Sequence, residues 1–178
     1  FLENWATFYE ELYTSGGNEQ FEHFELPVEE EGPQCLNSPP SLEELSNELK
    51  ITAKNKSPGF DSIRVSEMVS LIDTEAFPLF GKILELFWHL EKIPKALKKI
   101  ILVPLLKDPD KDIHDCSNYR PIALVSCLLK LYQSILNRRL LKFAEERKLL
   151  SDFQFGFRSD RSVVDAHLLL RETVIANK

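Results

Sequence analysis

The stretch "SNYRPIALVSCLLK", residues 117–130, holds one arginine, a proline directly after it, and then an apolar run. Because the residue before a proline avoids the helical region of backbone space, Arg120 is expected to be extended. We therefore predict a second strand or extended segment from Tyr119 to Ser126, followed by the strongest helix of the chain, from Leu128 to Lys148. Arg120 would then be held rigidly where the chain enters its core.

An earlier segment, "KKIILVPLLK" (residues 98–107), is apolar and β-branched and predicts a first strand. Pro104 within it indicates an edge strand or a bulge. Residues 108–118 form a loop, so an antiparallel hairpin would bring Lys107 and Arg120 side by side. Two adjacent cations on a rigid hairpin can hold an oligophosphate, because Lys acts as a point charge and Arg donates in a planar fork. The alternative is a pair of surface charges at strand ends, which spacing alone favours.

The remaining segments are mostly helical. An aromatic-rich helix is expected over residues 1–13, and "SLEE" at Ser41 is a capping box that begins a second helix. A third helix is expected from about Thr74 to Glu91, and a last one begins near Ser162. The expected buried stripes are Phe80, Ile83, Phe87 and Leu90 in the third helix, and Leu129, Tyr132, Leu136, Leu140 and Phe143 in the helix after the hairpin. This order of elements indicates an α+β fold, or an α/β fold with few strands.

The charge is divided unevenly along the chain. Its 178 residues have a net charge of −6, but residues 1–49 have −12 and residues 50–178 have +6. We expect an acidic helix and Pro-rich linker over residues 1–40, and one folded domain over residues 41–178. A basic domain suits a polyanion, but a solvated acidic linker beside an ordinary domain explains the charge equally well. Three cysteines, an odd and sparse number, fit a reducing intracellular compartment.

A second candidate site is "QFGFR", residues 154–158. Gly156 between two phenylalanines suggests a close approach of backbone. Gln154, Arg158 and Arg161 could donate to phosphates or base edges, with aromatic rings nearby for stacking. The alternative is a tight loop packed by its own phenylalanines, and the residues alone favour it.

Other chemistry is excluded by spacing. Asp108, Asp110 and Asp112 alternate as a calcium loop does, but that loop needs Gly at its sixth position and Glu at its twelfth. Ile113 and Tyr119 occupy those positions, so a solvated turn is expected. The sequence contains neither G-x-G-x-x-G nor G-x-x-x-x-G-K-S/T, so the common glycine-rich phosphate-binding loops are not expected. We expect no metal site and no catalytic residue in this chain.

Four segments together resemble a known family. They are "NKSPGFDSI" (55–63), "ILVPLLK" (101–107), "NYRPIALVSCLLKLYQSILNRRL" (118–140) and "LSDFQFGFRSDRSVVDA" (150–166). In order and spacing they are similar to the fingers of reverse transcriptases from non-LTR retrotransposons, especially the jockey-like elements of animals. The resemblance extends from about Ser41 to Lys178. It implies the fingers and start of the palm of a right-hand polymerase, mostly helical with a short β-hairpin.

The resemblance also implies roles for individual residues. Lys107 and Arg120 would contact the triphosphate of the incoming dNTP. The residues expected near template and primer are Asn55, Lys56, Ser57, Pro58, Gly59, Gln154, Gly156, Phe157 and Arg158. The implied partners are an RNA template, a DNA primer, dNTP and the remaining palm and thumb, with no membrane. The full-length enzyme would use Mg²⁺, none of it bound by this chain, and would act inside the cell, in the nucleus and cytoplasm.

The sequence departs from the family pattern in two respects. Phe60 replaces the usual proline and Ser62 the usual glycine, which relaxes that turn. The family holds two Mg²⁺ ions with aspartates from an AFD-like segment and an F/Y-A-D-D segment, and neither segment occurs here. We therefore expect a chain truncated before the catalytic palm that does not polymerise alone. The alternative is a catalytically inactive transposon-derived remnant that binds nucleic acid or protein.

Overall fold

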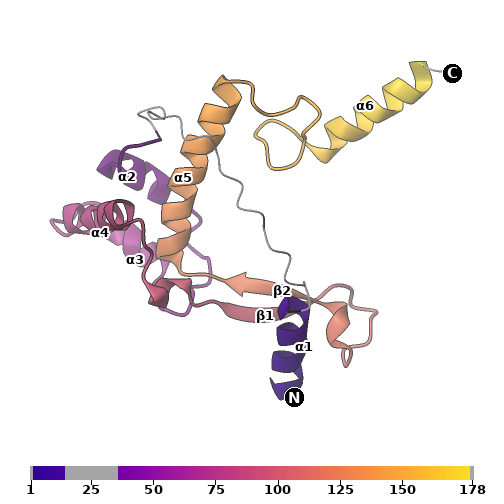
Figure 1. The fold of residues 1–178 in the computed structure, drawn as a ribbon, viewed down its shortest axis with the longest axis horizontal. Helices are drawn as coiled ribbons and strands as arrows, with labels where there is room; N and C mark the ends of the chain where they lie inside the picture. Colours follow the sequence, from indigo (N-terminus) through magenta and orange to yellow (C-terminus); the bar gives the residue numbers. More distant parts are fainter. Residues whose placement is uncertain (1, 15–35, 177–178) are drawn as a thin grey trace. The chain divides into compact units, whose positions relative to one another are not determined.

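The computed structural model describes residues 2–14 and 36–176. Within them the helices are α1 (Leu2–Thr14), α2 (Leu42–Ile51), α3 (Val65–Ser70), α4 (Phe77–Leu90), α5 (Cys127–Glu146) and α6 (Val163–Ala176). The strands β1 (Ile101–Leu106) and β2 (Tyr119–Leu124) form an antiparallel hairpin, and short 3-10 turns lie at Lys95–Lys98 and Cys116–Asn118 (Figure 1). The prediction of an α+β fold is confirmed. Most of the predicted linker lies outside the described residues.

The chain divides into two compact units, Phe1–Ile135 and Leu136–Lys178, with the boundary inside α5. In the first unit, the start of α2 is fixed by the predicted capping box. The Glu44 amide donates to Ser41 Oγ at 3.1 Å, and the Ser41 amide donates to a Glu44 carboxylate oxygen at 2.9 Å. Two of the four orphan amides at a helix start are satisfied in such a box, so local sequence is sufficient to begin this helix.

The buried stripe of α4 differs from the predicted one. Phe80 and Phe87 are buried as expected, but Ile83 and Leu90 are 41% and 55% exposed. The other buried positions are Phe77, Gly81 and Leu84. The helix ends where Glu91 adopts a left-handed conformation at φ 50°, three residues before Pro94. The buried face of α4 is therefore rotated about the helix axis by about one residue from the predicted face.

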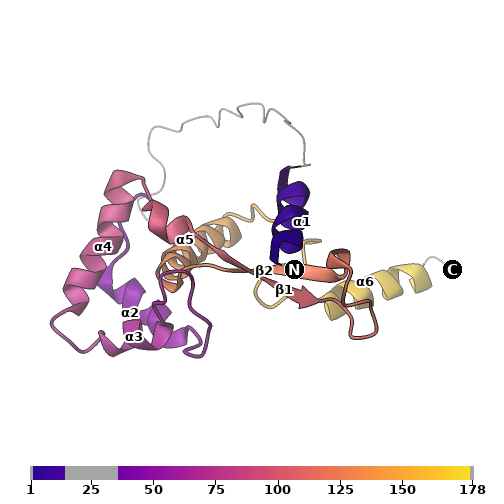
Figure 2. The same cartoon turned by 90° about the horizontal axis from the view of Figure 1, so that it is seen from below.

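The core of the first unit lies between α2, α3, α4 and the first half of α5 (Figures 1 and 2). Helix α3, which was not predicted, has six residues and buries Val65 and Met68. Phe87 of α4 and Tyr132 of α5 meet edge to face with ring centroids 6.0 Å apart. The buried residues of α5 are Cys127, Leu128, Leu129, Leu131, Tyr132 and Ile135.

The second unit contains the end of α5, a loop and α6. Leu140, predicted to be buried, is 55% exposed, and Leu136 and Phe143 are half-buried. Helix α6 begins with a reciprocal cap, because the Ser162 amide donates to the Asp165 carboxylate and the Asp165 amide donates to Ser162 Oγ. No described residue of α6 is buried. Among the described helices, none is long and apolar enough to cross a membrane.

Candidate functional site

The hairpin brings the two predicted nucleotide-binding cations together. Arg120 pairs with Leu105 across the two strands, and the Lys107 amide donates to the Asn118 carbonyl at 2.9 Å, which extends the register by one step. Side chains alternate between the faces of a strand, so Lys107 lies on the same face as Leu105 and Arg120. The predicted antiparallel hairpin is confirmed, and the two cations are diagonal neighbours at its loop end.

The loop at this end is shaped by carboxylates that cap its own turns. Asp108 and Asp112 each accept from the amide two residues ahead, at 3.1 Å and 2.8 Å. Asp115 accepts from both the amide and the hydroxyl of Ser117, and these hydrogen bonds lower the pKa of Asp115. Lys107 Nζ donates to the Ser117 carbonyl at 2.7 Å. The aspartates thus act as turn caps, as the solvated-turn prediction required.

Pro104 and Pro121 pair directly across the two strands. Because Lys107 donates to Asn118, alternation places the proline pair at a site without hydrogen bonds between the strands. Each proline nitrogen then points away from the ladder, where its missing N–H costs no bond within the hairpin. Both strands are edges, as Pro104 predicted, and both edges lack a donor at this position.

The two faces of the hairpin have different surroundings. On one face, the Trp5 ring of α1 meets the Tyr119 ring edge to face, with centroids 4.8 Å apart. Tyr119 also donates from its hydroxyl to the Ile113 carbonyl at 3.0 Å, which ties the strand to the loop. Arg120 points to the opposite face and is exposed, together with Val103 and Leu105 at 41% and 56%. Helix α1 therefore packs against the face of the hairpin that bears Tyr119, while the opposite face, which bears Arg120, is exposed.

The segment Asn55–Ile63, called the motif loop below, is docked on the junction between β2 and α5. An added Cβ on Gly59 would lie 2.5 Å from the Ser126 nitrogen and 2.6 Å from the Val125 carbonyl carbon. The Ser126 hydroxyl donates to Asp61 at 2.5 Å and accepts from the Leu129 amide at 3.3 Å. Ser126 thus caps α5 while it binds the motif loop.

The two departures from the family pattern have visible consequences in the motif loop. Ser62 has a φ of 60°, a left-handed conformation that costs an L-residue with a side chain but suits glycine. Phe60 is 57% exposed, and Lys99 Nζ lies 4.8 Å from its ring centroid. The turn is retained despite both replacements, because the Ser62 amide still donates to the Gly59 carbonyl at 3.1 Å.

In the second unit, Arg158 organises the loop that contains "QFGFR". Its guanidinium donates to both Glu145 carboxylate oxygens, at 2.8 Å and 2.7 Å, and to the Ser151 carbonyl at 2.7 Å. The Arg158 side chain is only 8% exposed. Arg161 makes a weaker bridge to Asp152 at 3.5 Å. Both arginines that suggested a phosphate site are thus bound within the second unit, and a template contact by Arg158 stays a prediction.

Gly156 makes no close backbone approach to another part of the described chain, and its role in a template site stays a prediction. A Cβ built at Gly156 meets no heavy atom within 4 Å. Phe157 is fully exposed at a φ of 61° and Phe153 is 78% exposed, so these two rings do not pack the loop. Phe155 is half-buried, and the Arg161 guanidinium lies 5.6 Å from its ring centroid. The arginine network holds this loop instead, and it presents Gln154, Gly156 and Phe157 on the surface.

We predict that Glu145→Gln will loosen this loop at neutral pH, because the substitution removes the charge that Arg158 pairs with. The measurement is the rate of tryptic cleavage after Arg158, with Glu146→Gln as the control, since the Glu146 bridge to Lys142 is long and exposed at 3.9 Å. Faster cleavage is expected in Glu145→Gln alone. Equal cleavage rates in both variants would contradict the structural role of the pair.

The same pair predicts how the loop responds to acid. The hydrogen bond from Arg158 and its charge lower the pKa of Glu145 below its ordinary value. A carboxylate with a depressed pKa stabilises the fold above its unfolded pKa, about 4.3, and loses that effect as the pH falls through the lower folded-state value. Amide protection of residues 151–158 is therefore expected to fall below about pH 4, and Glu145→Gln should remove that dependence.

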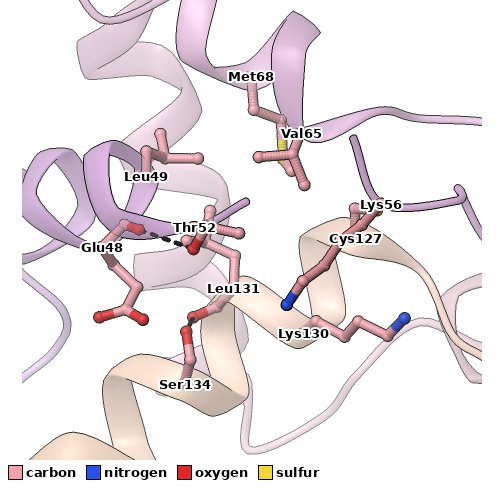
Figure 3. Close-up of a pocket in the computed structure, with 10 residues that line it drawn as sticks. All are labelled: Glu48, Leu49, Thr52, Lys56, Val65, Met68, Cys127, Lys130, Leu131 and Ser134. Atoms are coloured by element: carbon pink, nitrogen blue, oxygen red, sulfur yellow. Dashed lines mark hydrogen bonds between the residues drawn. The ribbon is translucent and has the colours of Figure 1, made fainter. Parts of the chain in front are cut away.

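A cavity of about 230 Å³ lies where α2, the motif loop, α3 and α5 meet (Figure 3). Its lining residues are Glu48, Leu49, Thr52, Lys56, Val65, Met68, Cys127, Lys130, Leu131 and Ser134. Lys56 was predicted as a template contact, whereas Lys130 was not singled out as a site residue. The spacing of the apolar residues around Lys130 predicts a helix. It does not predict which other element that helix packs against, because those contacts involve residues far away in the sequence.

The described residues contain no group of three or more His, Cys, Asp or Glu side chains that could hold a metal ion. Cys116 and Cys127 are free thiols, while Cys35 lies outside the described part. Within residues 2–14 and 36–176, the side chains thus do not provide the clustered carboxylates that a two-metal polymerase centre needs.

Comparison with known proteins supports the resemblance seen in the sequence. Residues 106–177 match the family described as reverse transcriptase (RNA-dependent DNA polymerase). A probable RNA-directed DNA polymerase from transposon BS of Drosophila melanogaster is 28% identical over 158 residues, 82% of this chain and 17% of the relative. The Pol polyprotein from the type-1 retrotransposable element R1 of Bradysia coprophila is 35% identical over 141 residues, 72% of this chain and 13% of the relative.

A third relative is the RNA-directed DNA polymerase from mobile element jockey of Drosophila melanogaster, 29% identical over 118 residues, 66% of this chain and 13% of the relative. The chain thus spans no more than 17% of the length of these relatives.

Proposed function

Because this chain is related to the reverse transcriptases of non-LTR retrotransposons, we propose that it forms the fingers, and the start of the palm, of such a polymerase. In this role it grips the incoming dNTP and the RNA template, while the palm and thumb of the full-length enzyme hold the primer. The family match and the relatives support a reverse transcriptase, and they do not favour the alternative of a catalytically inactive remnant. The enzyme would act in the nucleus and cytoplasm.

One observation above all supports a dNTP contact: the register that aligns Lys107 and Arg120 on one open face of a rigid hairpin. The proline pair and the Trp5–Tyr119 contact limit the freedom of the strands, so little backbone ordering remains to be done on binding. Arg120 can donate two parallel hydrogen bonds to one phosphate, and the Lys107 ammonium can leave the Ser117 carbonyl for another.

Support for a template contact comes from two exposed segments. The motif loop offers Asn55, Lys56 and Ser57, all exposed, from a backbone that is fixed to α5 by Gly59 and Asp61. In the second unit, the fully exposed Phe157 ring is available for stacking on a base. Polar side chains and aromatic faces of this kind bind single strands without requiring a particular sequence.

The family match implies a divalent metal-dependent polymerase in the full-length enzyme. We propose that this metal is Mg²⁺ and that it is held by residues other than those described here. When bound, such ions would supply positive charge that stabilises the transferring phosphoryl group. The part of this chain is to hold the outer phosphates with fixed positive charge, which needs no carboxylate cluster of its own.

The test is binding of dATP to the 178-residue chain, measured calorimetrically at low salt without divalent metal. Arg120→Ala and Lys107→Ala are each expected to weaken binding about tenfold, the lower end of the range for a hydrogen bond to a charged group. Lys82→Ala, at an exposed position of α4, removes the same charge and is expected to change little. Equal weakening in all three variants would mean diffuse attraction and contradict a hairpin site.

A further inference from the structure

The cavity beside the motif loop has an apolar floor that is almost completely buried. Leu49, Val65, Met68, Cys127 and Leu131 line it, and each of them is 3% exposed or less. Two of these residues present sulfur, which makes favourable contacts with aromatic rings. Such a floor suits a flat, apolar or aromatic group better than a hydrated ion.

The rim of the cavity is polar: the buried carboxylate of Glu48 lines it, together with hydroxyls and lysines. The Thr52 and Ser134 hydroxyls donate to backbone carbonyls one turn earlier, at 2.7 Å and 2.9 Å, so their oxygens remain as acceptors. Lys56 and Lys130 make no ion pair within the described part of the chain. Figure 3 shows the Lys56 side chain directed in among the lining residues, and Lys130 extending from α5 beside it.

We propose that this cavity binds one unstacked nucleotide of the single-stranded RNA template, with its base against the sulfur-lined floor and its phosphates on Lys56 and Lys130. An amino group of the base, such as that of adenine, would donate to the Thr52 and Ser134 oxygens. This inference rests on the proposed template-binding function and adds to it a pocket for a single base, formed by α2, α3 and α5 beneath the motif loop.

The size of the cavity supports a single base. A dry protein cavity of about 150 Å³ holds benzene, and pockets for drug-sized ligands begin at about 300 Å³. At about 230 Å³ this cavity lies between the two, so it has room for one ring system and not for two stacked bases. The strand must therefore leave its stack at this point, and the two lysines offset the repulsion between the phosphates that come together.

The test compares two synthetic eight-nucleotide RNA strands. One strand has a stable abasic spacer at every position, and the other has a single adenine in the middle of the same spacers. Both have the same phosphates, so any difference in affinity for the 178-residue chain reports the base alone. We expect about tenfold tighter binding of the strand with adenine, in the range found for one base stacked on a protein.

Variants then locate the site. Lys56→Gln and Lys130→Gln should each weaken both strands about fivefold, whereas Lys82→Gln should change neither by more than a general charge effect. Ser134→Leu places a larger side chain over the cavity from a half-buried position on α5. It is expected to abolish the advantage of the adenine strand and leave the affinity of the abasic strand unchanged, with an unchanged melting temperature as the check on folding.

The outcomes separate this inference from the function on which it rests. Equal binding of the two strands would leave RNA binding intact and overturn the base pocket. Displacement of the adenine strand by polyglutamate at equal charge would assign the lysines to an acidic protein and overturn it as well. If neither strand binds even at low salt, the proposed template contact of this chain fails, and the pocket fails with it.

Discussion

Leu84→Ala is expected to lower the free energy of unfolding by about 2–5 kcal/mol, the range for an emptied leucine site in a core. Leu84 is completely buried in the middle of α4. An added Cβ on Gly81, one turn earlier, would overlap the Leu42 side chain, so α2 and α4 are in close contact here and cannot easily collapse into a new gap. The loss is measured by urea denaturation monitored by circular dichroism.

The matched control for Leu84→Ala is Ile83→Ala, at the adjacent position of the same helix. Ile83 is 41% exposed, so this truncation removes less buried surface and is expected to cost less than about 1 kcal/mol. Neither variant loses helix propensity, because Ala is the best helix former, and the contrast therefore reports burial. If Ile83→Ala lowered the free energy of unfolding more than Leu84→Ala, the stripe predicted from the sequence would be the buried one, and the packing of α4 in the structure would be contradicted.

The difference between these two stripes shows what helical period can decide. The segment Phe77–Leu90 is apolar nearly all round, so both the predicted and the observed stripe satisfy the 3-4-3 spacing. Both include Phe80 and Phe87, which are buried in either case. The choice between Ile83 and Leu84 depends on where α2 and α5 lie, and no local pattern contains that information.

Local rules succeeded where the interaction is local. The capping box at Ser41, the hairpin between Lys107 and Arg120, and the start of the last helix near Ser162 depend on residues a few positions apart or on a single loop. Helix α3 was missed because six residues are too few to establish a period. The prediction that Leu140 is buried was wrong. An apolar stripe shows that a helix needs another element to pack against, but it does not show how far along the helix that element extends.

The candidate sites follow the same division. The two neighbouring cations on one face of the hairpin were predictable, since strand alternation and the length of one loop determine their positions. The docking of Gly59 on Ser126 joins residues 67 positions apart, and the cavity brings Lys56 next to Lys130 over a longer separation. For "QFGFR", the arginine was expected to bind outward, but the carboxylate of Glu145 was close enough to bind it within the fold.

Gly59→Ala is expected to destabilise the first unit by about 3 kcal/mol, the upper end of the range for overpacking. The φ of Gly59 is not in the left-handed region, so the cost is purely steric. The atoms that a new Cβ would meet, at 2.5 Å and 2.6 Å, belong to the backbone of Ser126 and Val125 and cannot rotate away. Relief requires the motif loop to lift, which also breaks the Asp61–Ser126 hydrogen bond.

A second substitution in the same loop should act in the opposite direction. Ser62→Gly removes a Cβ from a residue at φ 60° and should gain about 1 kcal/mol, partly offset by the greater freedom of glycine in the unfolded chain. Thermal melts of the two variants against the parent provide the measurement, with a decrease on the order of 10 °C for Gly59→Ala and a slight increase for Ser62→Gly. An unchanged melt for Gly59→Ala would mean that the motif loop does not rest on the start of α5. Lys56 would then have no fixed position beside Lys130, and the cavity between them would lose its physical basis.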